Sequence, residues 1–140
     1  MKILLPVDGS PYTKRMLSYI AAHDELLGPG HSYIVFTAVV PIPAYARRFL
    51  DRATVDGYYN EQAEAVLAPV RAFAEQQHWT VRIAHTHGHA ADAIAAIAET
   101  EKADLIVMGT HGHSALGNMV LGSVASGVLA RSKVPVLLVR

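Results

Sequence analysis

Residues 109 to 123, GTHGHSALGNMVLGS, hold the densest group of residues suited to ligand chemistry. Four of these fifteen residues are glycine, and Gly122 and Ser123 stand at the start of a segment with helical character. Glycine loses more backbone entropy on folding than other residues, but it lets the main chain approach a ligand closely. A helix start adds unpaired N–H groups and a favourable dipole for an anion. We therefore predict that this glycine loop (residues 109–123) binds phosphate.

Better-known glycine motifs do not fit this loop. Gly117 to Ser123 has the glycine spacing of a Walker motif, but no lysine follows the second glycine. Gly112 begins a run like a nucleophile elbow, but Leu116 stands where that motif has its second glycine. No G-x-G-x-x-G occurs in the chain. The loop is therefore not expected to be that of a typical P-loop NTPase or of an α/β-hydrolase.

Histidine is the second chemically versatile residue type in this sequence. Five of the eight histidines lie at positions 85, 87, 89, 111 and 113. His85 and His87 alternate on one face of an expected strand, a spacing that can share a zinc, copper or nickel ion. No Asp, Glu or Cys at a diagnostic spacing completes such a set. We expect no metal site here, and a histidine-based metal sensor is the third alternative.

Composition limits the classes of function. The 140 residues fit one domain, 1–140, with 51% hydrophobic and 17% charged residues and a formal net charge of zero. Because the sequence has no run of like charges, we expect no electrostatic binding to nucleic acid or to an anionic membrane. Cysteine is absent, which excludes disulfides and Cys-ligated zinc. No signal peptide and no apolar window of the ~20 residues that a membrane span needs are visible, so we expect a cytoplasmic location.

Short apolar runs alternate with helical patterns along the chain. Pro69 falls inside one helical pattern and is expected to kink or interrupt it. Residues 41–60 contain two prolines and no clear period, which predicts a functional flap or mobile segment. The apolar runs predict strands at 2–7, 32–40, 80–87, 103–109 and 134–140, and the helical patterns predict helices at 11–27, 61–78, 90–100 and 118–131.

This alternation predicts the fold class. The strands are continuous Val, Ile and Leu runs, typical of a parallel sheet covered on both faces. Right-handed crossovers then give a single-domain, doubly wound α/β fold with helices on both faces. Ligands of such sheets bind beyond the carboxyl ends of the strands, where the strand order reverses. The glycine loop follows strand 103–109, so we expect it at that edge.

The loop matches the pattern G-x2-G-x9-G-[ST]: Gly109 and Gly112 enclose two residues, and Gly112 and Gly122 enclose nine before Ser123. In this the chain resembles the ATP-binding branch of the universal stress protein family. ILLPVDGS is similar to the family's opening strand and acidic loop, DLIVMGTHG to its fourth strand and VPVLLVR to its closing strand. The resemblance covers the whole chain and implies a five-stranded parallel sheet of order 3-2-1-4-5.

The resemblance also implies a set of site residues for an adenine nucleotide, ATP with Mg²⁺ or alternatively AMP or ADP. His113 stands where the family often has Arg or Lys, and Ala125 stands where it often has Ser or Thr, so phosphate binding is expected to be weaker. The implied residues are Pro6, Val7 and Asp8 at the ribose side, Val39 or Val40 at adenine, Met108 and Gly109 as the wall, His111 shaping the loop, and Gly112, His113, Gly122, Ser123, Val124 and Ala125 around the phosphates.

We expect a regulatory stress-response module rather than an enzyme. No catalytic set is found, because Asp8 is the only candidate carboxylate and the loop has no Lys or Arg, so at most slow ATP hydrolysis is expected. Arg47, Arg48 and Arg52 lie in residues 41–60, but nothing in the sequence places them over the cleft. The unprotected edge of Val134–Arg140 and the resemblance imply a homodimer paired through that strand. The alternative is a dimeric interaction module that binds no nucleotide.

Overall fold

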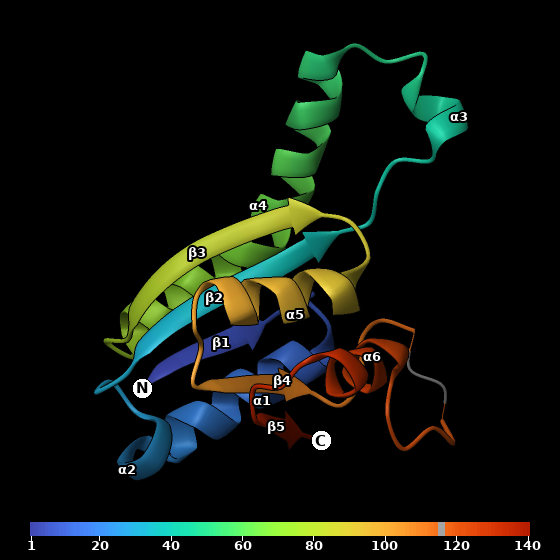
Figure 1. The fold of residues 1–140 in the computed structure, drawn as a ribbon. Helices are drawn as coiled ribbons and strands as arrows, with labels where there is room; N and C mark the ends of the chain where they lie inside the picture. The colour runs from blue at the N-terminus through green and yellow to red at the C-terminus, as the bar shows by residue number, and fades with distance from the viewer. Residues whose placement is uncertain (115–116) are drawn as a thin grey trace.

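Five parallel strands form one sheet in the order β3-β2-β1-β4-β5 (Figure 1). The structure is a computed structural model that describes residues 1–114 and 117–140. Ala115 and Leu116, which belong to the nine-residue spacing of the glycine loop and to the elbow-like run, lie outside the described residues. The strands are β1 (Lys2–Pro6), β2 (Ser32–Val39), β3 (Thr80–His87), β4 (Leu105–Gly109) and β5 (Val136–Val139). The predicted fold class and strand order are confirmed.

Helices cover both faces of the sheet. They are α1 (Pro11–Ala22), α2 (Asp24–Leu27), α3 (Ala44–Arg47), α4 (Arg52–Gln76), α5 (Ala90–Thr100) and α6 (Ser123–Arg131). Side chains alternate across β1, so that Ile3 and Leu5 enter the core beneath α1 and α4, while Leu4 enters the core beneath α5 and α6. Both cores are apolar and fully buried at their centres, which fixes the register of the parallel strands.

Residues 41–60, expected to be a flap or mobile segment without a clear period, are largely helical. They contain α3 and the first turns of α4, which begins at Arg52 rather than at residue 61. Asp51 caps α4, its Oδ1 accepting a hydrogen bond from the Thr54 backbone N–H at 2.7 Å. Residues 40–58, called the arm below, include no buried residue, and Figure 1 shows the arm extending beyond the sheet. In the arm, Ile42 and Val55 pack against the core but are only partly buried, so the segment shows no continuous hydrophobic period.

Two other helix boundaries and the effect of Pro69 differ from the prediction. The helix predicted over 11–27 ends at Ala22 because His23 has a non-helical backbone, and α2 follows as a separate turn. Pro69 lies inside α4, which continues through it instead of breaking. The last helix begins at Ser123, not at residue 118. No helix within residues 1–114 and 117–140 combines the length and the apolar character that crossing a membrane requires.

Candidate functional site

A cavity of about 300 Å³ opens at the carboxyl edge of the sheet. Its walls come from the ends of β1, β2 and β4, the first turns of α5 and α6, and the glycine loop. In the strand order, β1 and β4 are neighbours although they are far apart in sequence, which is the reversal point of a doubly wound sheet. The cavity therefore lies at the place expected for a ligand site in this fold.

Thirteen of the fourteen residues expected at the site line this cavity. Val39 does not: it packs into the core under α1 and α4, whereas its neighbour Val40 faces the cavity and is 80% exposed. Successive strand residues point to opposite faces, so only one of the two can line the cavity. The residues brought together are Pro6, Val7, Asp8, Val40, Met108, Gly109, His111, Gly112, His113, Gly122, Ser123, Val124 and Ala125.

Seven lining residues were not predicted from the sequence. Phe36 and Ala38 share the β2 face of Val40 at two-residue spacing, so the strand period alone would have found them. Ile94 lies one turn after Ala90 on α5, whose role at the site has no signature in the sequence. The seven are Thr13, Phe36, Ala38, Ala90, Ile94, Ser114 and Met119.

The Asp8 carboxylate is held in one orientation by its own loop. Its Oδ1 accepts hydrogen bonds from the Ser10 backbone N–H at 2.9 Å and from Thr13 Oγ1 at 3.0 Å. The Asp8 backbone N–H in turn donates to Thr13 Oγ1 at 3.1 Å. Gly9, with φ +76°, makes the turn that brings these groups together, a conformation that favours glycine. Oδ2 is left facing Gly112 and can accept a hydrogen bond from a ligand.

Two glycines are required by close approach. A Cβ at position 112 would lie 2.5 Å from Asp8 Oδ2, and a Cβ at position 109 would lie 2.7 Å from Tyr12 Cβ. Real Cβ atoms do not approach so closely. The glycine loop therefore packs directly on the segment that follows β1, and this contact forms one wall of the cavity.

Two histidines fasten the glycine loop. His111 Nε2 donates to the Met119 carbonyl at 2.8 Å, so in the neutral ring Nδ1 accepts from Thr110 Oγ1 at 2.9 Å. His113 Nε2 donates to the Asp8 carbonyl at 2.6 Å, across the cavity rim. Both imidazoles thus make protein contacts that define the shape of the loop.

The start of α6 supplies the donors for an anion. Gly122 is the N-cap and has no side chain to satisfy the first turn, and its own N–H donates to the Thr110 carbonyl at 2.7 Å. The N–H groups of Ser123, Val124 and Ala125 have no acceptor within the helix, because the first intrahelical bond is that of Ser126. All three residues line the cavity, so this helix end faces it directly.

One group of lining residues is apolar and is called the apolar slot. It consists of Phe36, Ala38 and Met108 from the strands and Ile94 from α5. Phe36 and Met108 are buried and belong to the core beneath α5 and α6, so the slot is rigid. Such a slot is suited to a flat, apolar group that joins a polar part at the helix end.

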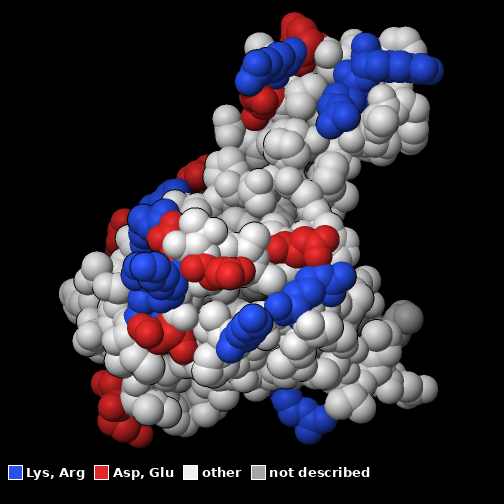
Figure 2. Space-filling model, viewed as in Figure 1, with Lys and Arg blue, Asp and Glu red and all other residues white. Residues whose placement is uncertain are grey.

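Positive charge is scarce around the cavity. No lysine or arginine occurs between Lys102 and Arg131, and none is among the described lining residues. Figure 2 shows blue and red side chains interspersed over the arm and the β3 side, whereas the region of the glycine loop, at lower right, is mostly uncharged. Asp8 is the single carboxylate among the described residues of the lining.

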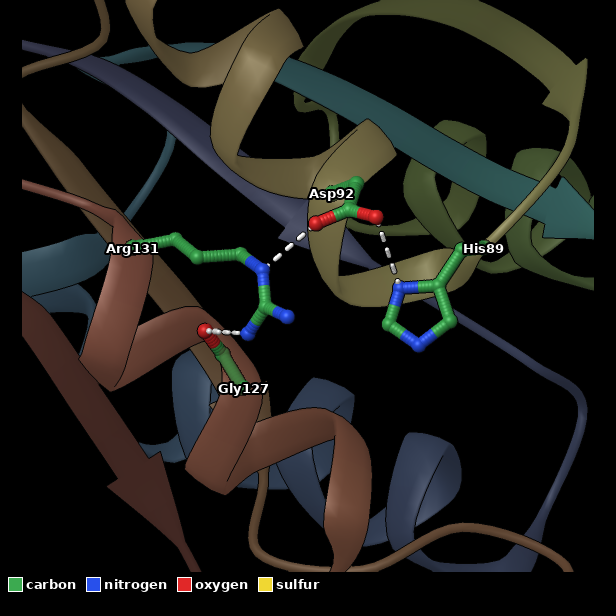
Figure 3. A network of polar contacts seen from close by, with 4 residues as sticks. All are labelled: His89, Asp92, Gly127 and Arg131. Carbon is green, nitrogen blue, oxygen red and sulfur yellow. Dashed lines mark hydrogen bonds and ion pairs between the residues drawn. The ribbon is translucent and has the colours of Figure 1, made fainter.

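A polar network joins the two helices that begin at the cavity (Figure 3). Asp92 of α5 accepts a hydrogen bond from Arg131 Nε of α6 and lies 3.1 Å from His89 Nδ1. Arg131 Nη1 also donates to the Gly127 carbonyl at 3.0 Å. A Cβ at position 127 would lie 2.6 Å from Ala91 Cβ, so this glycine lets the helices approach closely. Helices α5 and α6 are therefore packed tightly beside the site.

The histidines on and after β3 do not converge. His87 stacks on Tyr59 of α4 with ring centroids 4.1 Å apart, and His89 turns to Asp92 instead. Among the described residues, no group of three or more His, Asp or Glu side chains is placed to hold a metal ion. Nothing in this geometry favours the histidine-based metal sensor.

The reversed strand order and the cavity at the reversal point define the class: an open, doubly wound α/β protein with a ligand cleft. The model of the Universal stress protein family matches residues 1–140, and the chain belongs to this family. It is 38% identical to a universal stress protein of Thermus aquaticus, over 99% of this chain and 97% of the relative. It is 43% identical to one of Methanocaldococcus jannaschii, over 99% and 81%.

A solved structure of a universal stress protein in complex with cAMP is similar to this chain. It is 26% identical, aligns with 100% of this chain and 96% of the other, and superposes with a TM-score of 0.66. The predicted membership of the universal stress protein family is confirmed by the family model and the two relatives, whereas the ATP-binding branch stays a prediction.

Proposed function

We propose that this protein binds an adenine nucleotide in the cavity and acts as a regulatory module. The observation that carries the proposal is that one cavity combines three kinds of group: apolar side chains, the Asp8 carboxylate, and the start of α6. A nucleotide presents the matching three: a base, a ribose with hydroxyl donors, and a phosphate. The complex of a related universal stress protein with cAMP supports the same choice of ligand.

Each part of the nucleotide has a matching partner in this lining. Phe36 and Met108 offer apolar surface for the base. Asp8 Oδ2 faces the cavity wall at Gly112 and is positioned to accept from a ribose hydroxyl. The N–H groups of Ser123 to Ala125 are aimed at a phosphate.

Mg²⁺ and ATP are the finer form of this proposal. Magnesium is usually held through one or two carboxylates together with phosphate oxygens, and Asp8 is the carboxylate that this lining provides. When bound, the ion would neutralise phosphate charge next to Asp8.

We propose occupancy, without rapid turnover, as the mode of action. Phosphoryl transfer requires stabilisation of charge on the transferred group, and the described lining has no lysine or arginine for it. Slow hydrolysis is compatible with the lining. A bound nucleotide would bridge the glycine loop and α6, and so order a surface that a partner protein reads.

The proposed assembly is a homodimer through the β5 edge. Strand β5 ends the sheet order, so among the residues that the structure describes one of its two sides has no neighbouring strand. Val136, Leu137 and Leu138 are half-buried there, and pairing with a second copy would cover them. Sedimentation of the protein and of a Leu137→Lys variant tests this, and a monomeric wild type would refute it.

Titration calorimetry with adenosine, AMP, cAMP, ATP and GMP tests the proposed function. We expect binding of the adenosine compounds and loss of most of this affinity in Gly122→Val, because a Cβ there would lie 3.1 Å from His111 Cα. Gly117→Ala is the matched control in the same loop, where a Cβ meets no atom within 4 Å. Absence of binding by all adenosine compounds, with a folded protein, would favour an interaction module that binds no nucleotide.

A further inference from the structure

We infer that the cavity is built for a single phosphate group, so that an adenosine monophosphate or its cyclic ester binds at least as tightly as ATP. This inference rests on the proposed function and names the form of the nucleotide. It reverses the expectation that the family motif suggests, and it follows from the charges and donors of this chain.

The charge balance opposes a triphosphate. Each added phosphate brings negative charge into a site whose described lining has no lysine or arginine and one carboxylate, Asp8. A charge moved out of water needs an opposite charge or several hydrogen bonds in return. The helix dipole supplies only about half a positive charge at the start of α6. That is suited to one phosphate and falls short of three.

The hydrogen-bond donors of the cavity are almost all neutral. The first turn of α6 offers the N–H groups of Ser123, Val124 and Ala125 and the hydroxyl of Ser123, and the glycine loop adds Ser114 to the lining. His111 has both ring nitrogens engaged, with Thr110 and Met119. His113 donates its Nε2 proton to the Asp8 carbonyl. Further phosphates would therefore meet no lysine or arginine among the described lining residues.

The size of the cavity agrees with a ligand that carries one phosphate. Its volume of about 300 Å³ lies at the lower end of the range for small-molecule sites, roughly 300–1,000 Å³. A base on the apolar slot and a ribose take part of this volume, and one phosphate needs less of the remainder than three. The described lining supplies no lysine or arginine for the additional phosphates.

The arm contains a cluster of arginines, but none of these arginines lines the cavity. Arg47 and Arg48 lie on and directly after α3, both exposed, and neither contributes to the cavity wall. Arg48 instead lies over the Phe49 ring at 5.0 Å. The structure therefore gives these arginines no contact with a bound phosphate.

Equilibrium binding of adenosine, AMP, cAMP, ADP and ATP, with and without Mg²⁺ at fixed ionic strength, tests the inference. We expect AMP to bind about tenfold more tightly than adenosine, and ADP and ATP to gain nothing further. His113→Arg, which adds a guanidinium to the lining, should lower the ratio of the Kd for ATP to the Kd for adenosine by about tenfold, with both constants measured in the same variant. Val120→Arg is the matched control, because Val120 lies on the same loop, 72% exposed and outside the cavity wall.

Several outcomes would overturn the inference. ATP or Mg²⁺-ATP binding more tightly than AMP to the wild type refutes it while leaving the proposed function intact. If that preference disappears in Arg47→Ala/Arg48→Ala, the arm supplies the charge and the inference is equally refuted. If no adenosine compound binds a folded protein, the proposed function fails and the inference fails with it. Thermal unfolding of each variant shows which of them are folded.

Discussion

Gly112→Ala tests the contact between the glycine loop and Asp8. The new Cβ would lie 2.5 Å from Asp8 Oδ2, whereas ordinary contacts begin at 3.4 Å, so the carboxylate must move by about 1 Å. Its Oδ1 would then lose the donors Ser10 N–H and Thr13 Oγ1, now at 2.9 and 3.0 Å. Hydrogen bonds to a charged group contribute about 1.5–3 kcal/mol each, less where solvent reaches them.

We therefore expect Gly112→Ala to lower the free energy of unfolding by about 1–2 kcal/mol, a fall in Tm of roughly 3–8 °C. The Kd for AMP should rise at least tenfold, since the displaced carboxylate no longer meets the ribose. Differential scanning calorimetry and titration calorimetry measure the two effects, with Gly117→Ala as the control that meets no atom within 4 Å. If Gly112→Ala melts and binds AMP as Gly117→Ala does, the reasoning about this contact is refuted.

Three further predictions concern stability. Gly57→Ala, in the exposed part of α4 with open space around its Cβ, should raise the free energy of unfolding by about 0.5–1 kcal/mol in urea titrations; a fall would contradict its helical setting. Gly127→Ala should lower it by about 1–3 kcal/mol, because its Cβ would lie 2.6 Å from Ala91 Cβ, and adding Ala91→Gly should restore most of the loss. Burial raises the pKa of Tyr33 to about 12, so its protonated form stabilises the fold below pH ~10 and this contribution is lost as the pH rises from ~10 toward 12. Tyr33→Phe, which also removes the 2.8 Å hydrogen bond to the Gly28 carbonyl, should flatten that alkaline loss in unfolding curves; an unchanged slope would contradict it.

The sequence predicted most of the sheet because buried parallel strands are continuous apolar runs. Val107 and Val35, for example, are fully buried and stand in such runs. The helices of the arm gave no periodic signal, because periodicity reports which face a helix buries and residues 40–58 include no fully buried residue. Its helices depend on capping at Asp51 and on local propensity, which are weaker signals.

The site was predictable where a motif or backbone geometry determines it, and less so where packing does. The glycines and Asp8 line the cavity as expected, because a close approach leaves a mark in the sequence. The resemblance left Val39 and Val40 as alternatives. Successive residues of β2 point to opposite faces, and Val39 points into the core instead of into the cavity. Ile94 and Ala90 enter through the placement of α5, a tertiary effect without a local signature.

The close contact of Gly127 with Ala91 has a mechanical consequence. With no Cβ at position 127, α6 rests on α5 without a gap, and the Arg131 to Asp92 bond prevents the two from sliding apart. Both helices begin at the cavity, with Ala90 and Ser123 in its wall. A ligand that shifts the start of α6 is therefore expected to shift α5 as well. The occupied and empty forms would then differ at the distant ends of both helices, far from any atom the ligand touches.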